Sequence, residues 1–258
     1  MCIRDRYNID GRKLLPIVLV GTTAGTASEI TRFSVITIDE TGEKTSWSAP
    51  DSYAKVSFGD YRYTCSLPYH FTVSTALDTF SHATEAYFSK NADELSDIMA
   101  IETLKLLIPV LEELKDPNTE ITKEQREKLY RASIYAGFPL NRCGMNIGHK
   151  MSYYLTETRG VPHGNACALF QPTLLQHVET CVPDKTGAYY QGIGRTKQQV
   201  LDLLAALVAM DYEPVNDNEI EDLLGKWKEA PNMRAVVGDF DQEKQRTAAT
   251  RVMKLKLI

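Results

Sequence analysis

The chain has 258 residues, 43% hydrophobic and 24% charged, so it is long enough for one large globular domain or two smaller ones. Its formal net charge is -5, and no basic run is interleaved with aromatic residues, which excludes a nucleic-acid-binding surface from our expectations. The five cysteines are scattered without a CxxC pair, which argues against a disulfide framework or a thiolate zinc site and favours a reducing, cytoplasmic location.

The beginning of the chain contains two segments that need separate treatment. Residues 1–6, MCIRDR, match no pattern in the rest of the chain, so we exclude them from the fold as non-native sequence. The apolar run LLPIVLV (14–20) comes after charged residues, as the core of a signal peptide does. It is short and leads into a structured turn, so we predict a buried strand of a parallel sheet and no membrane association.

Residues 7–67 are predicted to form the C-terminal part of an α/β domain. RFSVITI (32–38) is rich in β-forming residues and precedes a turn, after which TSWSAP (45–50) can return as the second arm of a hairpin. AKVSFGD (54–60) is a further short strand candidate. Helical patterns prevail after this point, so residues 68–258 are predicted to form a helical domain.

The helical part shows several clear segments. Apolar residues recur at nearly helical period over 91–114, and the segment 122–140 opens with Thr122 and Gln125 at the spacing of a capping box. Two more helices are predicted over 196–210 and 217–230.

The segment TALDTFSHATEAY (75–87) reads as a buried helix that carries an acid and an imidazole. Asp78 and His82 are four residues apart and therefore share one helix face. By themselves they are explained by a local hydrogen bond or a satisfied core histidine. Glu85 lies on nearly the same face; it could orient a ligand or be a buried, paired carboxylate, and we favour the structural role. A buried carboxylate is costly unless it is paired or bound to a cation.

Two further histidines lie in NIGHKMSYYLTETRGVPHGNACAL (146–169). His149 comes early in a predicted helix, and His163 lies in a tight loop between a proline and a glycine that allows close backbone approach. With Asp78 and His82 they make one carboxylate and three imidazoles. Oxygen and nitrogen donors without thiolate suit Fe2+ or Zn2+, although spacing alone does not bring them together. The remaining histidines, His70 and His177, are predicted to be structural.

The turn GTTAGTASEIT (21–31) comes directly after the apolar strand. Small hydroxyl residues and glycines at this place can hydrogen-bond a phosphate or ribose and admit close backbone approach. A plain strand-to-helix turn is the alternative interpretation.

These three stretches, in this order, resemble the motifs of the iron-containing (group III) alcohol dehydrogenases. TTAGTASEIT is similar to TTAGTGSEVT, ALDTFSHATEAY to DALTHAIEAY, and GMNIGHKMSYYLTETRGVPHGNACALFQP to the long signature GLVHAMAHPLG…PHGxANA. The resemblance implies the dehydroquinate synthase-like fold: an α/β remnant of a dinucleotide-binding domain, then an all-α helical domain, with the active site between them. The strands and glycine-rich loop expected before residue 16 are absent, so we expect an N-terminally truncated chain.

The resemblance also assigns roles to individual residues. The implied metal ligands are Asp78, His82, His149 and His163. The implied contacts to NAD or NADP are Thr22, Thr23, Thr26 and Lys44. Where the family usually has a second histidine, four residues after the first, this chain has Tyr153. Its hydroxyl can donate or relay a proton, with a reference pKa of about 10, which makes Tyr153 the candidate catalytic residue.

The implied function is hydride transfer between nicotinamide and a metal-bound alcohol or carbonyl. The protein would then be an NAD(P)-dependent alcohol dehydrogenase or aldehyde reductase that uses Fe2+ or Zn2+, acts on small alcohols or aldehydes and forms a homodimer. Two alternatives stay open. The same donors could activate water in a metal-dependent hydrolase, or the chain could be an inactive fragment of the dehydrogenase.

Overall fold

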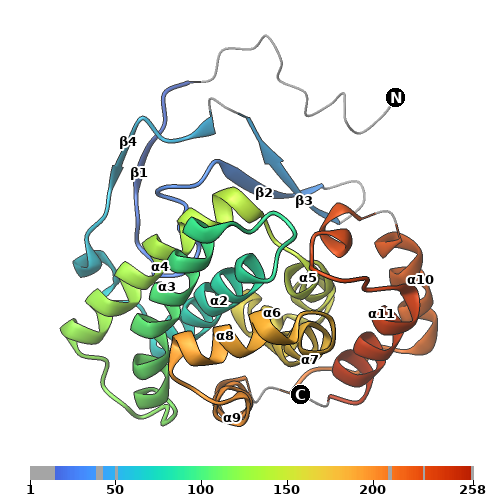
Figure 1. The fold of residues 1–258 in the computed structure, drawn as a ribbon. Coiled ribbons are helices and arrows are strands. Elements are labelled where there is room, and N and C mark those ends of the chain that lie inside the picture. Colours follow the sequence, from blue (N-terminus) through green and yellow to red (C-terminus); the bar gives the residue numbers. More distant parts are fainter. Residues whose placement is uncertain (1–14, 39–42, 50–51, 209–210, 229, 257–258) are drawn as a thin grey trace.

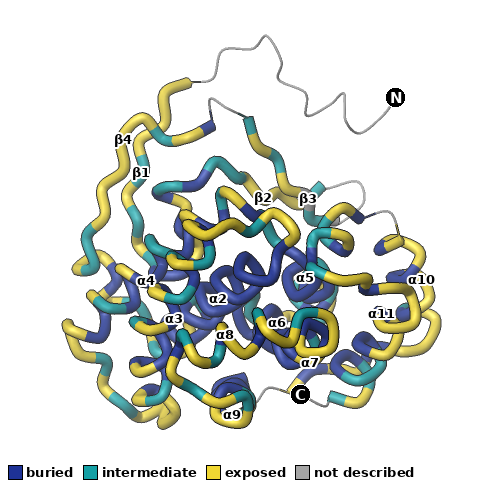
Figure 2. Tube along the Cα trace, viewed as in Figure 1, coloured by how far each residue is buried: buried dark blue, intermediate teal, exposed yellow. Residues whose placement is uncertain are grey.

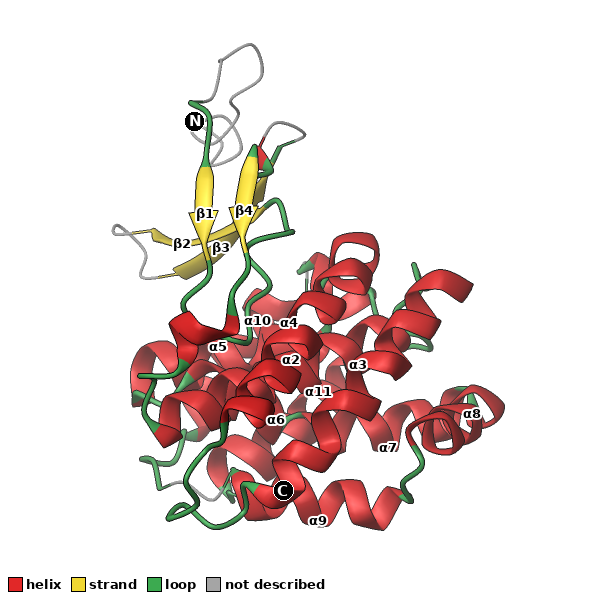
Figure 3. Ribbon diagram, turned by 90° about the vertical axis from the view of Figure 1, so that its left-hand side faces the viewer, coloured by secondary structure: helices red, strands yellow, loops and turns green. Residues whose placement is uncertain are grey.

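The computed structural model describes residues 15–38, 43–49, 52–208, 211–228 and 230–256. A small β-rich part precedes a large body of helices and stands on one side of it (Figures 1 and 3). Residues 1–6, which we excluded as non-native, lie outside the described ranges. In the part of the chain that the structure describes, no helix is long and apolar enough to cross a membrane.

The β-rich part contains two separate pairs of strands. Strands β1 (Val18–Val20) and β4 (Val56–Phe58) are parallel, with Val18 opposite Val56. Strands β2 (Phe33–Ile38) and β3 (Glu43–Ser48) are antiparallel, with Phe33 opposite Ser48. The structure therefore confirms the predicted hairpin and the predicted strand within residues 54–60.

The prediction that the first strand is buried is wrong. Val18 and Val20 of β1 are 59% and 50% exposed, and Phe58 of β4 is 55% exposed. Figure 2 shows exposed residues along much of both strands. A parallel strand is buried when further strands and helices flank it on both faces. Within the described ranges β1 and β4 form a sheet of two strands, which leaves these side chains uncovered.

From Tyr69 onward the described chain is predominantly helical. The α-helices are α2 (Tyr69–Tyr87), α3 (Glu94–Glu113), α4 (Lys123–Cys143), α5 (Ile147–Arg159), α6 (His163–Leu169), α7 (Gln171–Cys181), α8 (Pro183–Ile193), α9 (Lys197–Leu207), α10 (Asp217–Trp227) and α11 (Gln242–Ala249). Shorter helical turns are η2 (Tyr61–Thr64), η3 (Pro231–Arg234) and η4 (Thr250–Lys254).

The predicted capping box is present at the start of α4. Thr122 Oγ1 accepts a hydrogen bond from the Gln125 backbone N–H at 3.2 Å, and Gln125 Oε1 accepts one from the Thr122 N–H at 2.8 Å. Asp93 and Ser96 make the same arrangement at the start of α3. Such caps satisfy backbone donors that a helix end leaves free. They explain why these helices begin where they do.

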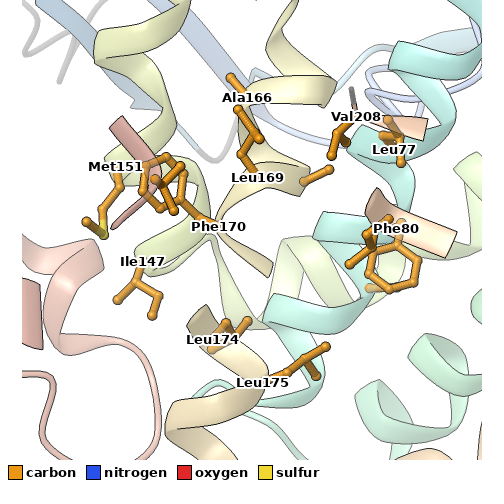
Figure 4. Close-up of a cluster of buried hydrophobic side chains, with 14 of the residues drawn as sticks. Leu77, Phe80, Ile147, Met151, Ala166, Leu169, Phe170, Leu174, Leu175 and Val208 are labelled. Atoms are coloured by element: carbon orange, nitrogen blue, oxygen red, sulfur yellow. The ribbon is translucent and has the colours of Figure 1, made fainter. Parts of the chain in front are cut away.

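Helix α2 lies in the middle of the helical body, with α3, α4 and α6 packed against it. Its Leu77 and Phe80 have no exposed surface. Figure 4 shows them among core side chains from α5, α6 and α7. Because α2 is covered on most sides, the polar residues that it carries are buried together with the apolar ones.

Helix α6 comes unusually close to α2. His163 is the first residue of α6, so the predicted loop position is wrong: Pro162 ends the loop and the helix begins at once. A Cβ atom built at Gly164 would lie 1.7 Å from the Ser74 carbonyl oxygen. Only glycine fits this approach, as the sequence predicted, and it holds His163 next to α2.

We predict that Gly164→Ala destabilises the protein by about 1–3 kcal/mol, because a backbone carbonyl cannot move aside for the added methyl group. Gly187→Ala in α8 is the matched control, since nothing lies within 4 Å of its Cβ position. The control should stabilise α8 by about 0.5–1 kcal/mol. Urea unfolding measures the free energy of unfolding of both variants. An unchanged value for Gly164→Ala would contradict the packing argument.

Candidate functional site

One carboxylate oxygen of the central helix meets three imidazole nitrogens. Asp78 Oδ1 lies 3.2 Å from His149 Nε2, 3.5 Å from His82 Nε2 and 3.7 Å from His163 Nε2. Asp78, His82 and His149 are buried, and the His163 side chain is 35% exposed. The four residues that spacing alone could not bring together therefore converge on one point.

Three helices position these side chains. Asp78 and His82 lie one turn apart on α2 and face the same side. His149 is the third residue of α5, and its ring stacks on that of His82 with centroids 4.8 Å apart. His163 begins α6, held there by the close approach at Gly164.

The distances from Asp78 Oδ1 to the histidine nitrogens are closer to those between ligands of one cation than to those of hydrogen bonds. N–H···O bonds are usually 2.7–3.2 Å long, and two of the three contacts to Asp78 are longer than this. Donors held at about 2.1 Å around a tetrahedral ion lie roughly 3.4 Å from one another. The three separations from Asp78 to the histidines, 3.2–3.7 Å, bracket that value, as expected of neighbouring ligands of a divalent ion such as Fe2+ or Zn2+. Asp78, His149 and His163 also belong to a group of donors that all lie within 4.8 Å of one another, and His82 is not in that group.

The protonation states of the cluster differ between its members. Burial would raise the pKa of Asp78, but His82, His163 and His149 outweigh it and hold the pKa below its usual range. Burial lowers the pKa of His82 to about 4, so this imidazole is neutral at neutral pH. Metal ions bind deprotonated carboxylates and neutral imidazoles, and Asp78 and His82 are in that state. Burial would lower the pKa of His149, but Cys167, Glu85 and Asp78 outweigh it and raise that pKa. Cys167 and Asp78 also raise the pKa of His163, so a cation has to displace a proton from each of these two imidazoles.

Glu85 fixes the orientation of His149. Its side chain is fully buried and accepts hydrogen bonds from the backbone N–H groups of Asn146 (2.8 Å) and His149 (3.1 Å) and from Gln171 Nε2 (3.0 Å). Glu85 Oε1 also lies 2.7 Å from His149 Nδ1. This contact at Nδ1 turns His149 Nε2 toward the cluster, where a bound cation could replace the Nε2 proton. The favoured structural role of Glu85 and the orienting role are thus combined in one residue.

Cys167 is a functional candidate that the sequence analysis missed. It is fully buried on α6, and its Sγ atom and donor atoms of Asp78, His149 and His163 all lie within 4.8 Å of one another. The sequence analysis argued against a thiolate zinc site because the chain has no CxxC pair, and it did not consider a single cysteine beside the histidines. Because the cysteines are scattered, no cysteine motif pointed to Cys167. The four-residue spacing from His163 to Cys167 would have placed both residues on one face of a helix.

A cavity of about 880 Å³ opens over the cluster. It lies between the β2–β3 hairpin and the helices, and Figures 1 and 3 show the hairpin beside α5. Thr26 and Lys44, two of the implied cofactor contacts, line this cavity together with Asp78 and the three histidines. Thr22 and Thr23 are not among the residues that line it, although they belong to the same turn.

Tyr153 lines the same cavity and stacks on His163, with ring centroids 5.8 Å apart. Lys44 Nζ lies 5.7 Å from the centre of the tyrosine ring. Burial raises the pKa of Tyr153 to about 12, so its phenol is neutral at neutral pH. In this state it can donate a hydrogen bond but cannot act as a base.

The two histidines predicted to be structural lie outside the lining of this cavity. His70 is exposed on α2. His177 Nε2 lies 2.9 Å from the Val237 carbonyl oxygen, and its ring packs edge-on against Phe240.

Comparison with known proteins identifies related sequences. The family model for the C-terminal part of the Fe-containing alcohol dehydrogenase family matches residues 72–255, and the model for iron-containing alcohol dehydrogenase matches residues 3–61. 1,3-propanediol dehydrogenase of Citrobacter freundii is 32% identical over 214 residues, which cover 80% of this chain and 54% of that protein. The chain thus spans about half the length of this relative.

Similar solved structures agree with these matches. An iron-containing alcohol dehydrogenase from Thermotoga maritima superposes with a TM-score of 0.85 at 29% identity, covering 98% of this chain and 68% of that one. Sulfoacetaldehyde reductase from Bifidobacterium kashiwanohense, solved in complex with NAD+, gives a TM-score of 0.81 at 28% identity, covering 92% and 64% of the two chains.

We predict that Glu85→Gln destabilises the protein by about 1–3 kcal/mol, because the amide presents donors to the buried N–H groups that the carboxylate now satisfies. Glu127→Gln on the exposed side of α4 is the matched control and should change stability by less than about 0.5 kcal/mol. Urea unfolding compares the two variants. Equal free energies of unfolding would show that Glu85 does not hold α5 and its histidine in place.

Proposed function

This chain belongs to the iron-containing alcohol dehydrogenase family, and on that premise we propose that the protein is a metal- and NAD(P)-dependent alcohol dehydrogenase or aldehyde reductase. It would transfer hydride between nicotinamide and a small alcohol or aldehyde. The observation that carries the proposal is the contact of one Asp78 oxygen with three imidazole nitrogens at 3.2–3.7 Å.

Asp78, His82, His149 and His163 are the residues that would hold the metal in this proposal. Fe2+ is the metal named by the family, and Zn2+ accepts the same oxygen and nitrogen donors. When bound, the cation supplies Lewis acidity to the oxygen of the alcohol or carbonyl. Asp78 contributes the negative charge of the ligand set, and Glu85 keeps His149 in the tautomer that a metal requires.

Residues of the turn and the hairpin would place the nicotinamide cofactor. Thr26 and Lys44 support this because they line the cavity above the proposed ligands, and Thr22 and Thr23 lead into Thr26. The NAD+ complex of sulfoacetaldehyde reductase favours NAD over NADP. Tyr153, neutral and stacked on His163, would donate a hydrogen bond to the substrate oxygen or relay its proton.

Three further parts of the proposal rest on other observations. The division into an α/β part (7–67) and a helical domain (68–258) is supported by the change from strands to helices at Tyr69. A cytoplasmic location is supported by the cysteines of the described ranges, since Cys65, Cys143, Cys167 and Cys181 are all free thiols. A homodimer rests on the family resemblance.

We predict that His82→Ala removes the bound metal, because it deletes a nitrogen donor that contacts Asp78. Metal analysis after anaerobic loading with Fe2+ should find an equimolar ion in the unaltered chain and little in the variant. His70→Ala changes an exposed histidine and should keep the full metal content. Equal metal content in all three proteins would show that His82 is not a ligand.

We predict that Tyr153→Phe lowers kcat by about 10²–10⁴-fold if the hydroxyl serves in proton transfer. With a pKa of about 12, Tyr153 should add no titration step to the rate at neutral pH. Tyr153→His should retain activity and add a step near the reference imidazole pKa of about 6.5.

Reduced-nicotinamide absorbance with 1,3-propanediol as the alcohol measures these rates in the Fe2+-loaded chain. Full activity of Tyr153→Phe would remove Tyr153 from the mechanism. No reaction in the unaltered, metal-loaded chain would favour the inactive-fragment alternative, and metal-dependent hydrolysis without nicotinamide would favour the hydrolase.

A further inference from the structure

The thiol of Cys167 is the reactive group in the cluster that the proposed function does not use. Its side chain has no exposed surface, although it lies beside residues that line the cavity. In the signature PHGxANA, the position that corresponds to Cys167 is asparagine. This chain therefore places a sulfur atom where the signature has an amide.

The position of the sulfur suits a shared cation. Cys167 comes one turn of α6 after His163, so both side chains project to the same side. Its Sγ lies 3.7 Å from His163 Nε2, and it belongs to the group of donors within 4.8 Å of one another that includes Asp78 and His149. Sulfur at about 2.3 Å and nitrogen at about 2.0 Å from one ion lie roughly 3.0–3.7 Å apart when the angle between them is about 90–120°.

A neutral buried thiol is the competing explanation. Cys167 Sγ lies 3.2 Å from Ser152 Oγ, which in turn donates to the His149 carbonyl oxygen at 2.8 Å. Because the Ser152 hydroxyl donates its proton to that carbonyl oxygen, its Oγ atom can accept a weak hydrogen bond from the thiol of Cys167. In this arrangement the Cys167 thiol has a hydrogen-bond partner without a metal. An experiment must therefore distinguish the neutral thiol from the metal-bound sulfur.

We propose that Cys167 is a sulfur ligand of the metal in addition to the four ligands of the proposed function, on the side of Asp78, His149 and His163, and that it makes the site prefer Zn2+ over Fe2+. This inference rests on the proposed function, because it uses the same cluster. On binding, the thiol releases its proton to solvent and the sulfur lone pair bonds the cation. Thiolate ligands favour zinc over the harder metals that oxygen-rich sites take.

Anaerobic titration with Co2+ reports on the ligands directly. The unaltered 258-residue chain should show the visible bands of bound cobalt together with a near-ultraviolet thiolate-to-cobalt charge-transfer band. Cys167→Ser and Cys167→Asn should lose the charge-transfer band and keep the visible bands. Cys143→Ser is the matched control, because Cys143 is also buried but lies outside the donor cluster, and it should keep both.

Competition between Zn2+ and Fe2+ tests the preference. We expect Cys167→Ser to weaken zinc binding by roughly 10- to 100-fold, the range seen when a group that supports a bound metal is lost. Iron binding should change less, so the ratio of bound zinc to bound iron should fall. An unchanged ratio would overturn the assigned preference.

The outcomes separate this inference from the proposed function. Visible cobalt bands without a charge-transfer band in the unaltered chain would overturn the sulfur ligand and leave the metal site standing. A charge-transfer band that persists in Cys167→Ser would assign the sulfur to another cysteine and also overturn it. The absence of any cobalt bands would overturn the metal site and the inference together. If Cys167→Ser fails to fold, the spectra of Cys167→Asn and of the unaltered chain show whether Cys167 is the sulfur ligand.

Discussion

The arrangement of this protein depends on a charged carboxylate buried in the middle of a helical body. Asp78 lies on α2, which is covered by neighbouring helices, and an ionised carboxylate in such a place is costly without positive or donating partners. Its Oδ1 atom is met by imidazoles from α2, α5 and α6. Side chains of three helices thus meet at one oxygen atom, at 3.2–3.7 Å.

Contacts of Glu85 and Gly164 hold the helices in the positions that bring the histidines to Asp78. Glu85, one helical turn beyond His82, reaches α5 through the backbone of Asn146 and both the backbone and ring of His149. Gly164 lets α6 approach the backbone of α2, which no other residue would allow. A deformation of either contact would shift a histidine relative to Asp78. The same residues therefore stabilise the helical body and set the geometry of the site.

Both parts of the chain line the cavity above the cluster. The hairpin contributes Lys44 and the turn contributes Thr26 to a cavity whose floor is formed by the helices. Lys44 Nζ and the His163 ring both lie near the ring of Tyr153, 5.7 and 5.8 Å from its centre. Burial raises the pKa of this phenol to about 12, so Tyr153 is a neutral hydrogen-bond donor at neutral pH.

The amino-acid sequence by itself determined the local features: the hairpin, the capping box of Thr122 and Gln125, and the pairing of Asp78 with His82 on one helix face. These depend on residues a few positions apart, so short-range hydrogen bonding and helical periodicity suffice. Only the tertiary structure decided that His149 and His163 reach Asp78, that Cys167 stands beside them, and that the first strand is exposed. Helix packing and the coverage of a sheet join segments far apart in the chain, and no pattern of neighbouring residues encodes those distances.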